Sequence, residues 1–392
     1  MRISDSETMQ FVARHDIQRT GRSQHRPQPP SSGGPDGAQR DPFQTWHEQV
    51  ENELRTQIEQ FVDARCGEEL VTAGFDEPGR IVCDFVSGGK YLRPTFMYLG
   101  WLCGATESTP ALRASASLEL LHAFALLQDD VMDAADNRRG RPCAHRSLTA
   151  WHAEQGLSGS SSRFGDSAAV LLADLCLVWG ERMLRESGIE GTDLARVWPR
   201  YDAMRTELAI GQLADLLNDA RRIPALGDVL DIARRKSGNY TVRRPLELGA
   251  AMAGCPPAVM QALGEYGAVV GEAFQIRDDV LGVFGDPAVT GKPTGADLYE
   301  RKATTVVALA EHLTGPSGRA RLHELWAGRE VDEKAVQAAL TVIVDSGAAQ
   351  RAEQMITERF QLAQEILDNG VLDPSAATSL RRMALLCTER EH

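Results

Sequence analysis

Apolar residues recur at every third or fourth position along most of this chain. The first such stripe runs through Phe43, Trp46, Val50, Leu54, Ile58 and Phe61. Because residues with this spacing lie on one face of an α-helix, the stripe predicts an amphipathic helix. The same spacing predicts further helices at about 78–101, 111–134, 165–187, 194–219, 226–253, 257–284, 301–314, 333–345, 347–368 and 373–388. No segment alternates with the period of two that is typical of a strand, so we predict an all-α fold with one large helical domain.

The first 42 residues do not share this pattern. The stretch Arg22–Pro42 is rich in Pro, Gly, Ser and Gln, and such a segment cannot bury enough apolar surface to offset the entropy lost on ordering. We therefore expect a disordered N-terminal tail over residues 1–42 and one domain over residues 43–392. The tail has no apolar signal-peptide core, and its acidic residues are atypical of a transit peptide.

Charge and composition exclude some classes of function. The formal net charge is −13 and the pI is about 5.3, whereas a general nucleic-acid-binding protein needs a basic surface. A diphosphate could still bind through a local Lys/Arg cluster or through bridging cations. No apolar run reaches the ~18 residues of a transmembrane helix. The seven cysteines form no Cys-x-x-Cys pair, which fits reduced thiols in a cytoplasmic protein.

An acidic motif at residues 128–133 ends an apolar stretch and is the first candidate site. Residues i and i+4 share a helix face, so Asp129 and Asp133 should project side by side, with Asp130 at their flank. Carboxylate oxygens suit Mg²⁺, which combines few carboxylates with substrate phosphates and water. Two arginines follow, Arg138 and Arg139. Because guanidinium groups bind phosphate oxygens in bidentate fashion, the motif and its basic flank together predict a magnesium–diphosphate site.

A second acidic motif ends another apolar stretch. It comprises Gln275, Asp278 and Asp279, and Lys292 and Lys302 follow it. Two such helix ends that face each other could hold several metal ions between them. One short acidic motif is common on protein surfaces, but two with basic flanks are far more specific.

A glycine-rich segment supplies a third candidate element. Gly88 and Gly89 allow the backbone to approach a ligand closely. Lys90 and Arg93 are three positions apart and can face one anion. His122 lies two helical turns before the first acidic motif, on nearly the same face. Without its context, this histidine could equally be a buried core residue.

In their order and spacing, these motifs resemble the trans-isoprenyl diphosphate synthases, also called polyprenyl synthetases. The resemblance extends from residue 43 to about residue 390. Its motifs are Gly-Gly-Lys-x-x-Arg-Pro (88–94), Asp-Asp-x-x-Asp (129–133), Arg-Arg-Gly (138–140), Lys236-Ser237, and Gln275 with Asp278-Asp279. The tract 278–286 is similar to that of geranylgeranyl diphosphate synthases from high-GC actinobacteria.

The resemblance implies a fold and a reaction. The fold is a helical bundle of the isoprenoid synthase type, with a central cavity lined by two Asp-rich helices. The reaction is head-to-tail condensation of isopentenyl diphosphate with an allylic partner, namely dimethylallyl, geranyl or farnesyl diphosphate. Three Mg²⁺ ions would clamp the allylic diphosphate, and members of the family are usually homodimers.

The resemblance also assigns residues. The implied metal ligands are Asp129, Asp130, Asp133, Asp278 and Asp279. The implied allylic diphosphate ligands are Arg138, Lys236 and Lys292. The implied isopentenyl diphosphate ligands are Lys90, Arg93, His122 and Arg139, and Lys302 would lie near the mouth of the cavity. Ser237 and Gln275 would present oxygens to the allylic carbocation.

Product length should depend on what blocks the floor of the cavity. Phe124 and Ala125 lie about one turn before the first acidic motif, and one aromatic beside one small residue resembles the geranylgeranyl-forming members. A farnesyl or longer product is the alternative, and Phe124 could also be ordinary core packing. The chain departs from the family at Gly282, where many members have a third Asp, at Ser237, which replaces Thr, and at Arg301, which replaces Gly.

Two other classes share part of the pattern. A terpene cyclase would use the first acidic motif but would not need Gly-Gly-Lys-x-x-Arg-Pro, because it binds a single diphosphate. Its second metal motif would contain a Ser and a Glu, and both are missing from the nearest candidate at 218–222. A non-catalytic partner subunit would have lost acidic residues, whereas the first motif here is complete.

Overall fold

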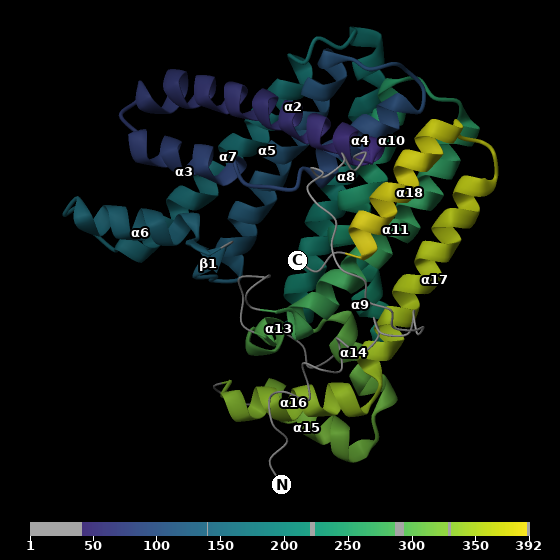
Figure 1. Cartoon of the computed structure of the whole chain (residues 1–392). Helices are drawn as coiled ribbons and strands as arrows, with labels where there is room; N and C mark the ends of the chain where they lie inside the picture. The colour runs from purple at the N-terminus through teal and green to yellow at the C-terminus, as the bar shows by residue number, and fades with distance from the viewer. Residues whose placement is uncertain (1–40, 139, 220–223, 287–293, 328–330, 390–392) are drawn as a thin grey trace, which may run out of the picture. The chain divides into compact units, whose positions relative to one another are not determined.

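A computed structural model describes residues 41–138, 140–219, 224–286, 294–327 and 331–389 of the chain. The predicted tail lies outside these ranges except for Asp41 and Pro42, and Pro42 already begins the first described helix. Arg139 and Lys292 also lie outside them. Within the described ranges nearly every element is helical, which confirms the prediction of an all-α fold (Figure 1).

The first half of the described chain forms one group of helices. They are α2 (Pro42–Arg65), η2 (Cys66–Val71), α3 (Asp76–Val86), α4 (Leu92–Leu102), α5 (Thr109–Met132), α6 (Ala144–Glu154), α7 (Ser161–Arg185) and α8 (Gly191–Asp219). Two short strands, β1 (Asn137–Arg138) and β2 (Arg141–Pro142), pair antiparallel with Asn137 opposite Pro142. Helix α5 packs against α2, α4 and α7, and half of its residues are buried.

The second half is arranged around α11. Its helices are α9 (Leu226–Ala233), η3 (Arg234–Arg243), α10 (Arg244–Met252), α11 (Pro257–Phe284), α13 (Ala296–Tyr299), α14 (Thr305–Leu313), α15 (Pro316–Ala327), α16 (Glu333–Asp345), α17 (Ala348–Asp368) and α18 (Pro374–Thr388). Helices α17 and α18, yellow in Figure 1, pack along α11. Helix α10 packs on α4 and joins the two halves.

The predicted helix over 78–101 is wrong, because residues 87–91 separate α3 from α4. Pro94 is the third residue of α4, where its missing N–H leaves no intrahelical hydrogen bond unmade. Tyr91, just before α4, has a left-handed backbone with φ 45°. A Cβ at Gly89 would come within 2.8 Å of an oxygen of Glu119. These local constraints turn the chain between two apolar stripes that the spacing alone had joined.

The predicted helix over 226–253 is continuous in outline but changes its winding. Between α9 and α10 it becomes the π-helix η3, in which the backbone N–H of Arg244 donates to the carbonyl of Asn239, five residues earlier. Helices α6 and α15 and the π-turn η2 were not predicted, and the predicted helix over 301–314 begins only at Thr305.

Both predicted acidic motifs lie in the last turns of long core helices, α5 and α11. The C-terminal end of a helix carries partial negative charge, so further carboxylates are unfavourable there unless cations lie close. The fold must therefore bring positive groups to these two helix ends.

Candidate active site

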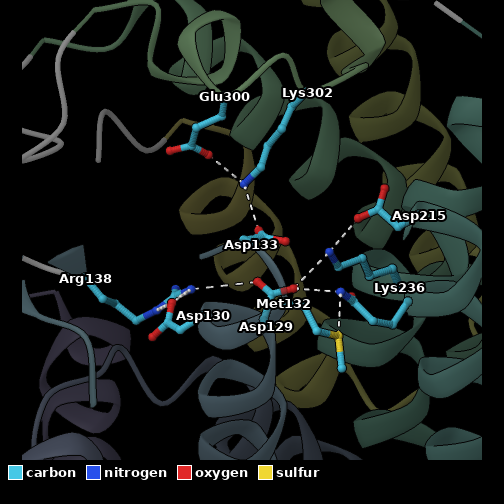
Figure 2. A network of polar contacts seen from close by, with 10 residues as sticks. Asp129, Asp130, Met132, Asp133, Arg138, Asp215, Lys236, Glu300 and Lys302 are labelled. Atoms are coloured by element: carbon cyan, nitrogen blue, oxygen red, sulfur yellow. Dashed lines mark hydrogen bonds and ion pairs between the residues drawn. The ribbon is translucent and has the colours of Figure 1, made fainter. Parts of the chain in front are cut away.

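Asp129 is the centre of a polar network at the end of α5 (Figure 2). Its Oδ1 accepts hydrogen bonds from Lys236 Nζ at 3.2 Å and from Gln212 Nε2 at 3.0 Å. Its Oδ2 lies 3.7 Å from Arg138 Nη2. Three elements far apart in the sequence, β1, α8 and η3, thus converge on one carboxylate.

Nearby charges and burial shift the pKa of Asp129 in opposite directions. Burial raises its pKa, but the nearby charges of Lys236, Arg138 and Lys302 outweigh burial and hold the pKa below its usual value. Burial likewise lowers the pKa of Lys236, and the carboxylates of Asp129 and Asp215 more than reverse that effect. Both groups are therefore charged at neutral pH, and Asp129 is available as an anionic ligand.

The two other aspartates of the first motif differ in their surroundings. Asp130 is 1% exposed and accepts from Arg138 Nε at 2.8 Å and from Nη2 at 2.6 Å. Asp133 is more open and lies 3.4 Å from Lys302 Nζ. Burial and the charge of Asp129 raise the pKa of Asp133. Asp130 thus holds Arg138 beside the site, whereas Asp129 and Asp133 face Lys236 and Lys302 (Figure 2).

Three polar residues of this network were not predicted from the sequence. Gln212 and Asp215 lie one turn apart on α8, and Asp215 Oδ2 accepts from Lys236 Nζ at 2.6 Å. Glu300 Oε2 lies 2.8 Å from Lys302 Nζ. The spacing of Gln212 and Asp215, which places both on one face of α8, is the sequence signal that could have identified these two residues.

The second motif divides between a buried and a more open aspartate. Asp279 is 6% exposed. Its Oδ1 accepts from Gln275 Nε2 at 2.8 Å, and its Oδ2 accepts from the backbone N–H of Thr305 at 2.8 Å. Burial raises the pKa of Asp279 to about 7. Because both oxygens accept protein hydrogen bonds, Asp279 anchors the N-terminus of α14 here, whereas Asp278 is half-buried and is the more accessible carboxylate of the two.

The structure explains why a glycine occupies position 282. Gly282 lies one turn after Asp278 on α11, and a Cβ at this position would overlap the carboxylate of Asp297. The helix α13, which carries Asp297, therefore packs directly on α11. The backbone N–H of Lys302 donates to the carbonyl of Asp297 at 2.7 Å, and Lys302 reaches Asp133. This connection links the second motif to the first. Arg301, another departure, has a left-handed backbone with φ 55°, a conformation in which glycine has no steric cost.

The glycine-rich element lies beside η3. Arg93 Nη2 donates to Thr241 Oγ1 at 2.9 Å, and its guanidinium lies 4.6 Å from the centre of the Tyr240 ring. The His122 ring lies 6.2 Å from the same ring. The structure thus brings Arg93 and His122 to one aromatic side chain, and Lys90 is exposed on the preceding loop.

The donor set suits a metal that is held jointly with a substrate. Among the described residues, no three His, Cys, Asp or Glu side chains converge closely enough to hold a metal ion by themselves. Mg²⁺ rarely needs such a cage, because it takes one or two carboxylates and completes its shell with phosphate oxygens and water. The ionised Asp129, beside basic groups able to donate to a phosphate, fits that mode of binding.

The remaining predicted residues are placed as follows. Phe124 is half-buried against the core of the first half of the chain, and Ala125 is half-buried next to it. Ser237 follows Lys236 in η3 and is also half-buried. All seven cysteines carry free thiols. Within the described part of the chain, no helix is long and apolar enough to cross a bilayer.

Comparison with known proteins identifies relatives of the chain. The polyprenyl synthetase family matches residues 79–343. A geranylgeranyl diphosphate synthase of Mycobacterium tuberculosis is 33% identical over 74% of this chain and 77% of its own length. A geranylfarnesyl diphosphate synthase of Aeropyrum pernix is 32% identical over 72% of this chain and 83% of its own.

A solved structure shares both fold and sequence. It is geranylgeranyl pyrophosphate synthase from Corynebacterium glutamicum, complexed with isoprenyl diphosphate and magnesium. It superposes with a TM-score of 0.81 and is 34% identical, covering 87% of this chain and 99% of its own.

Proposed function

The chain belongs to the polyprenyl synthetase family, and from this membership we propose that it condenses isopentenyl diphosphate head to tail with allylic diphosphates, forming geranylgeranyl diphosphate. It is a prenyltransferase of isoprenoid biosynthesis. The observation that carries the proposal is the convergence of Lys236, Gln212 and Arg138 on Asp129 at the end of a core helix.

The proposed allylic subsite is the network of Figure 2. Asp129, Asp133 and Asp278 would ligate magnesium, for which we propose three ions, and bound Mg²⁺ neutralises charge that develops on the diphosphate leaving group. Lys236 and Arg138, now paired with Asp129, would donate to diphosphate oxygens when substrate binds. Asp130 and Asp215 would keep these two cations in place. Lys292 and Arg139 belong to the proposed subsites on sequence grounds alone.

The second diphosphate, that of isopentenyl diphosphate, needs a metal-free cationic subsite. Lys90, Arg93 and His122 would supply it, with Lys302 at the mouth. The double bond of isopentenyl diphosphate would attack the allylic cation, which the oxygens of Ser237 and Gln275 stabilise. The proton lost from the product would pass to the released diphosphate, so no separate general base is required.

For product length we propose the geranylgeranyl chain of 20 carbons. The relatives above differ in product, since one is named for geranylgeranyl and the other for geranylfarnesyl diphosphate. The pair Phe124 and Ala125 supports the shorter of these. An aromatic ring on α5 would stop the growing apolar tail, because protein interiors are too densely packed to yield easily.

We also propose a cytoplasmic homodimer. The free cysteines support the compartment. Large apolar side chains are exposed on α7, at Leu171 and Val178, and on α8, at Ile210, Leu213 and Leu217. An ion pair between Glu181 and Arg205 connects these two helices. A second copy would cover this surface, and sedimentation velocity of the parent and of Leu213→Glu tests the proposal.

The decisive experiment is product analysis with the purified chain. Isopentenyl diphosphate and each allylic primer are supplied with Mg²⁺ or with EDTA, and dephosphorylated products are separated by chromatography. We expect geranylgeraniol in the presence of Mg²⁺ alone. A hydrocarbon formed without isopentenyl diphosphate would instead identify a terpene cyclase. Activity that requires a second protein would identify a regulatory subunit.

A further inference from the structure

We propose that Thr241, assisted by Tyr240, is a positioning residue that holds Arg93 in the orientation needed to bind the diphosphate of isopentenyl diphosphate. The inference rests on the proposed function, because it takes Arg93 as a ligand of that diphosphate. It adds a connection between the two diphosphate subsites through the π-helix η3.

The contacts of Arg93 fix its guanidinium from two sides. Thr241 Oγ1 accepts from Nη2 at 2.9 Å, and the Tyr240 ring lies 4.6 Å from the guanidinium carbon. Thr241 is completely buried and Tyr240 is 3% exposed. A threonine has one preferred rotamer or two, and a buried ring cannot reorient, so both partners are stiff. The long side chain of Arg93 is thereby ordered before any ligand arrives.

The two ends of the π-helix η3 serve the two diphosphate subsites. Lys236, near the start of η3, reaches Asp129, while Thr241, near its end, reaches Arg93. An α-helix has fewer residues per turn than a π-helix. In an α-helix, the side chain of residue 241 would therefore point in a different direction relative to that of residue 236. Short π-helical segments are rare and are frequently found at functional sites.

Close backbone packing makes η3 a rigid support. A Cβ at Gly211 of α8 would lie 2.8 Å from the backbone nitrogen of Lys236. A Cβ at Gly238 of η3 would lie 2.8 Å from the backbone of Gly271 on α11. Glycine therefore allows α8 and α11 to pack directly on the backbone of η3. Because η3 cannot shift between them, Thr241 and Tyr240 hold Arg93 at a constant distance from Lys236.

This arrangement should show itself in substrate binding. An arginine that is already oriented loses little conformational entropy when it binds an anion. Removal of the Thr241 hydroxyl should return Arg93 to several rotamers and weaken the hydrogen bonds that it makes. We expect the KM for isopentenyl diphosphate to rise about tenfold, in keeping with the loss of one hydrogen bond to a charged group. The KM for the allylic substrate should change much less.

The test compares Thr241→Val with Thr241→Ser. Valine keeps the shape and removes the acceptor, whereas serine restores the acceptor and should recover most of the affinity. Thr95→Val is the matched control, since Thr95 is also fully buried but its hydroxyl has no hydrogen-bond partner within the described residues. Tyr240→Leu should raise the same KM, and Tyr240→Phe, which keeps the ring, should do so less. Circular dichroism checks that each variant folds.

A double-mutant cycle with Arg93→Gln separates the possible failures. If Thr241 acts through Arg93, Thr241→Val should add nothing to the KM of the Arg93→Gln enzyme. If Arg93→Gln raises the KM for isopentenyl diphosphate but Thr241→Val does not, the positioning role is refuted and the proposed function stands. If Arg93→Gln itself leaves that KM unchanged, the subsite assignment is wrong and the inference fails with it. Equal effects of Thr241→Val on both substrates, together with a lower melting temperature, would show a merely structural role.

Discussion

Replacing Gly282 by aspartate would restore the third carboxylate that many members of the family carry in their second acidic motif, yet we expect it to damage this protein. A Cβ at position 282 would overlap the carboxylate of Asp297. The carboxylate of Asp297 must then move. The carbonyl of Asp297 accepts from the Lys302 backbone, and Lys302 pairs with Asp133. A change on α11 would therefore act next to the segment that carries Lys302 to the first acidic motif.

The cost of Gly282→Asp has a steric and an electrostatic part. Forcing extra atoms into a packed site costs about 1–3 kcal/mol. A new carboxylate about 4 Å from that of Asp297 would add up to about 4 kcal/mol at an effective dielectric constant of 20. The gain from replacing a helical glycine is below about 1 kcal/mol. Taken together these contributions lie between about 0 and about 7 kcal/mol, so we expect the metal-free protein to lose about 3 kcal/mol, or roughly 5 °C in melting temperature.

Thermal unfolding in EDTA and turnover with Mg²⁺ measure the two consequences. Gly227→Asp is the matched control, because Gly227 lies in a helix and a Cβ there meets no atom within 4 Å. Adding Asp297→Gly to Gly282→Asp removes the overlap and should recover part of the lost stability. If Gly282→Asp melts within about 1 °C of the parent and turns over normally, then Asp297 does not need the space, and the reasoning is refuted.

Three further predictions concern the site and the product. Gly282→Ala introduces the overlap without a new charge, so its melting temperature should lie between those of the parent and Gly282→Asp. A value at or below that of the aspartate variant would contradict the division of the cost into a steric and an electrostatic part. Asp129→Ala should cost at least ~3 kcal/mol of transition-state stabilisation, or roughly a hundredfold in turnover, with an unchanged circular dichroism spectrum; near-normal turnover would remove Asp129 from the metal site. Phe124→Ala should lengthen the product and Ala125→Phe should shorten it, as chromatography of dephosphorylated products would show; one chain length for all three proteins would place the floor of the cavity elsewhere.

Much of the fold followed from local patterns. Apolar spacing identified the long core helices α5 and α11, because a helix that packs on its neighbours must present apolar residues at regular intervals. It failed at residues 87–91, where α3 has ended and a left-handed Tyr91 precedes the start of α4. Spacing shows which face is apolar but contains no information on where the backbone must turn to pass Glu119.

The candidate site divides in the same way. The sequence by itself determined which carboxylates lie together on each helix end, since Asp129 and Asp133 are one turn apart on any α-helix. Only the tertiary structure decided that Asp130 and Asp279 point into protein partners, and that Gln212 and Asp215 join the site.

The physical reason for this division is the separation along the chain of the residues that interact. A helix repeats every few residues, so its faces can be read from neighbouring positions in the chain. Gln212 meets Asp129 across 83 residues, and Thr241 meets Arg93 across 148. Those contacts depend on how whole helices pack, and the close packing of η3 depends on glycines of α8 and α11 that allow its backbone to come close. Such packing is a property of the assembled molecule, and no local pattern in the chain contains it.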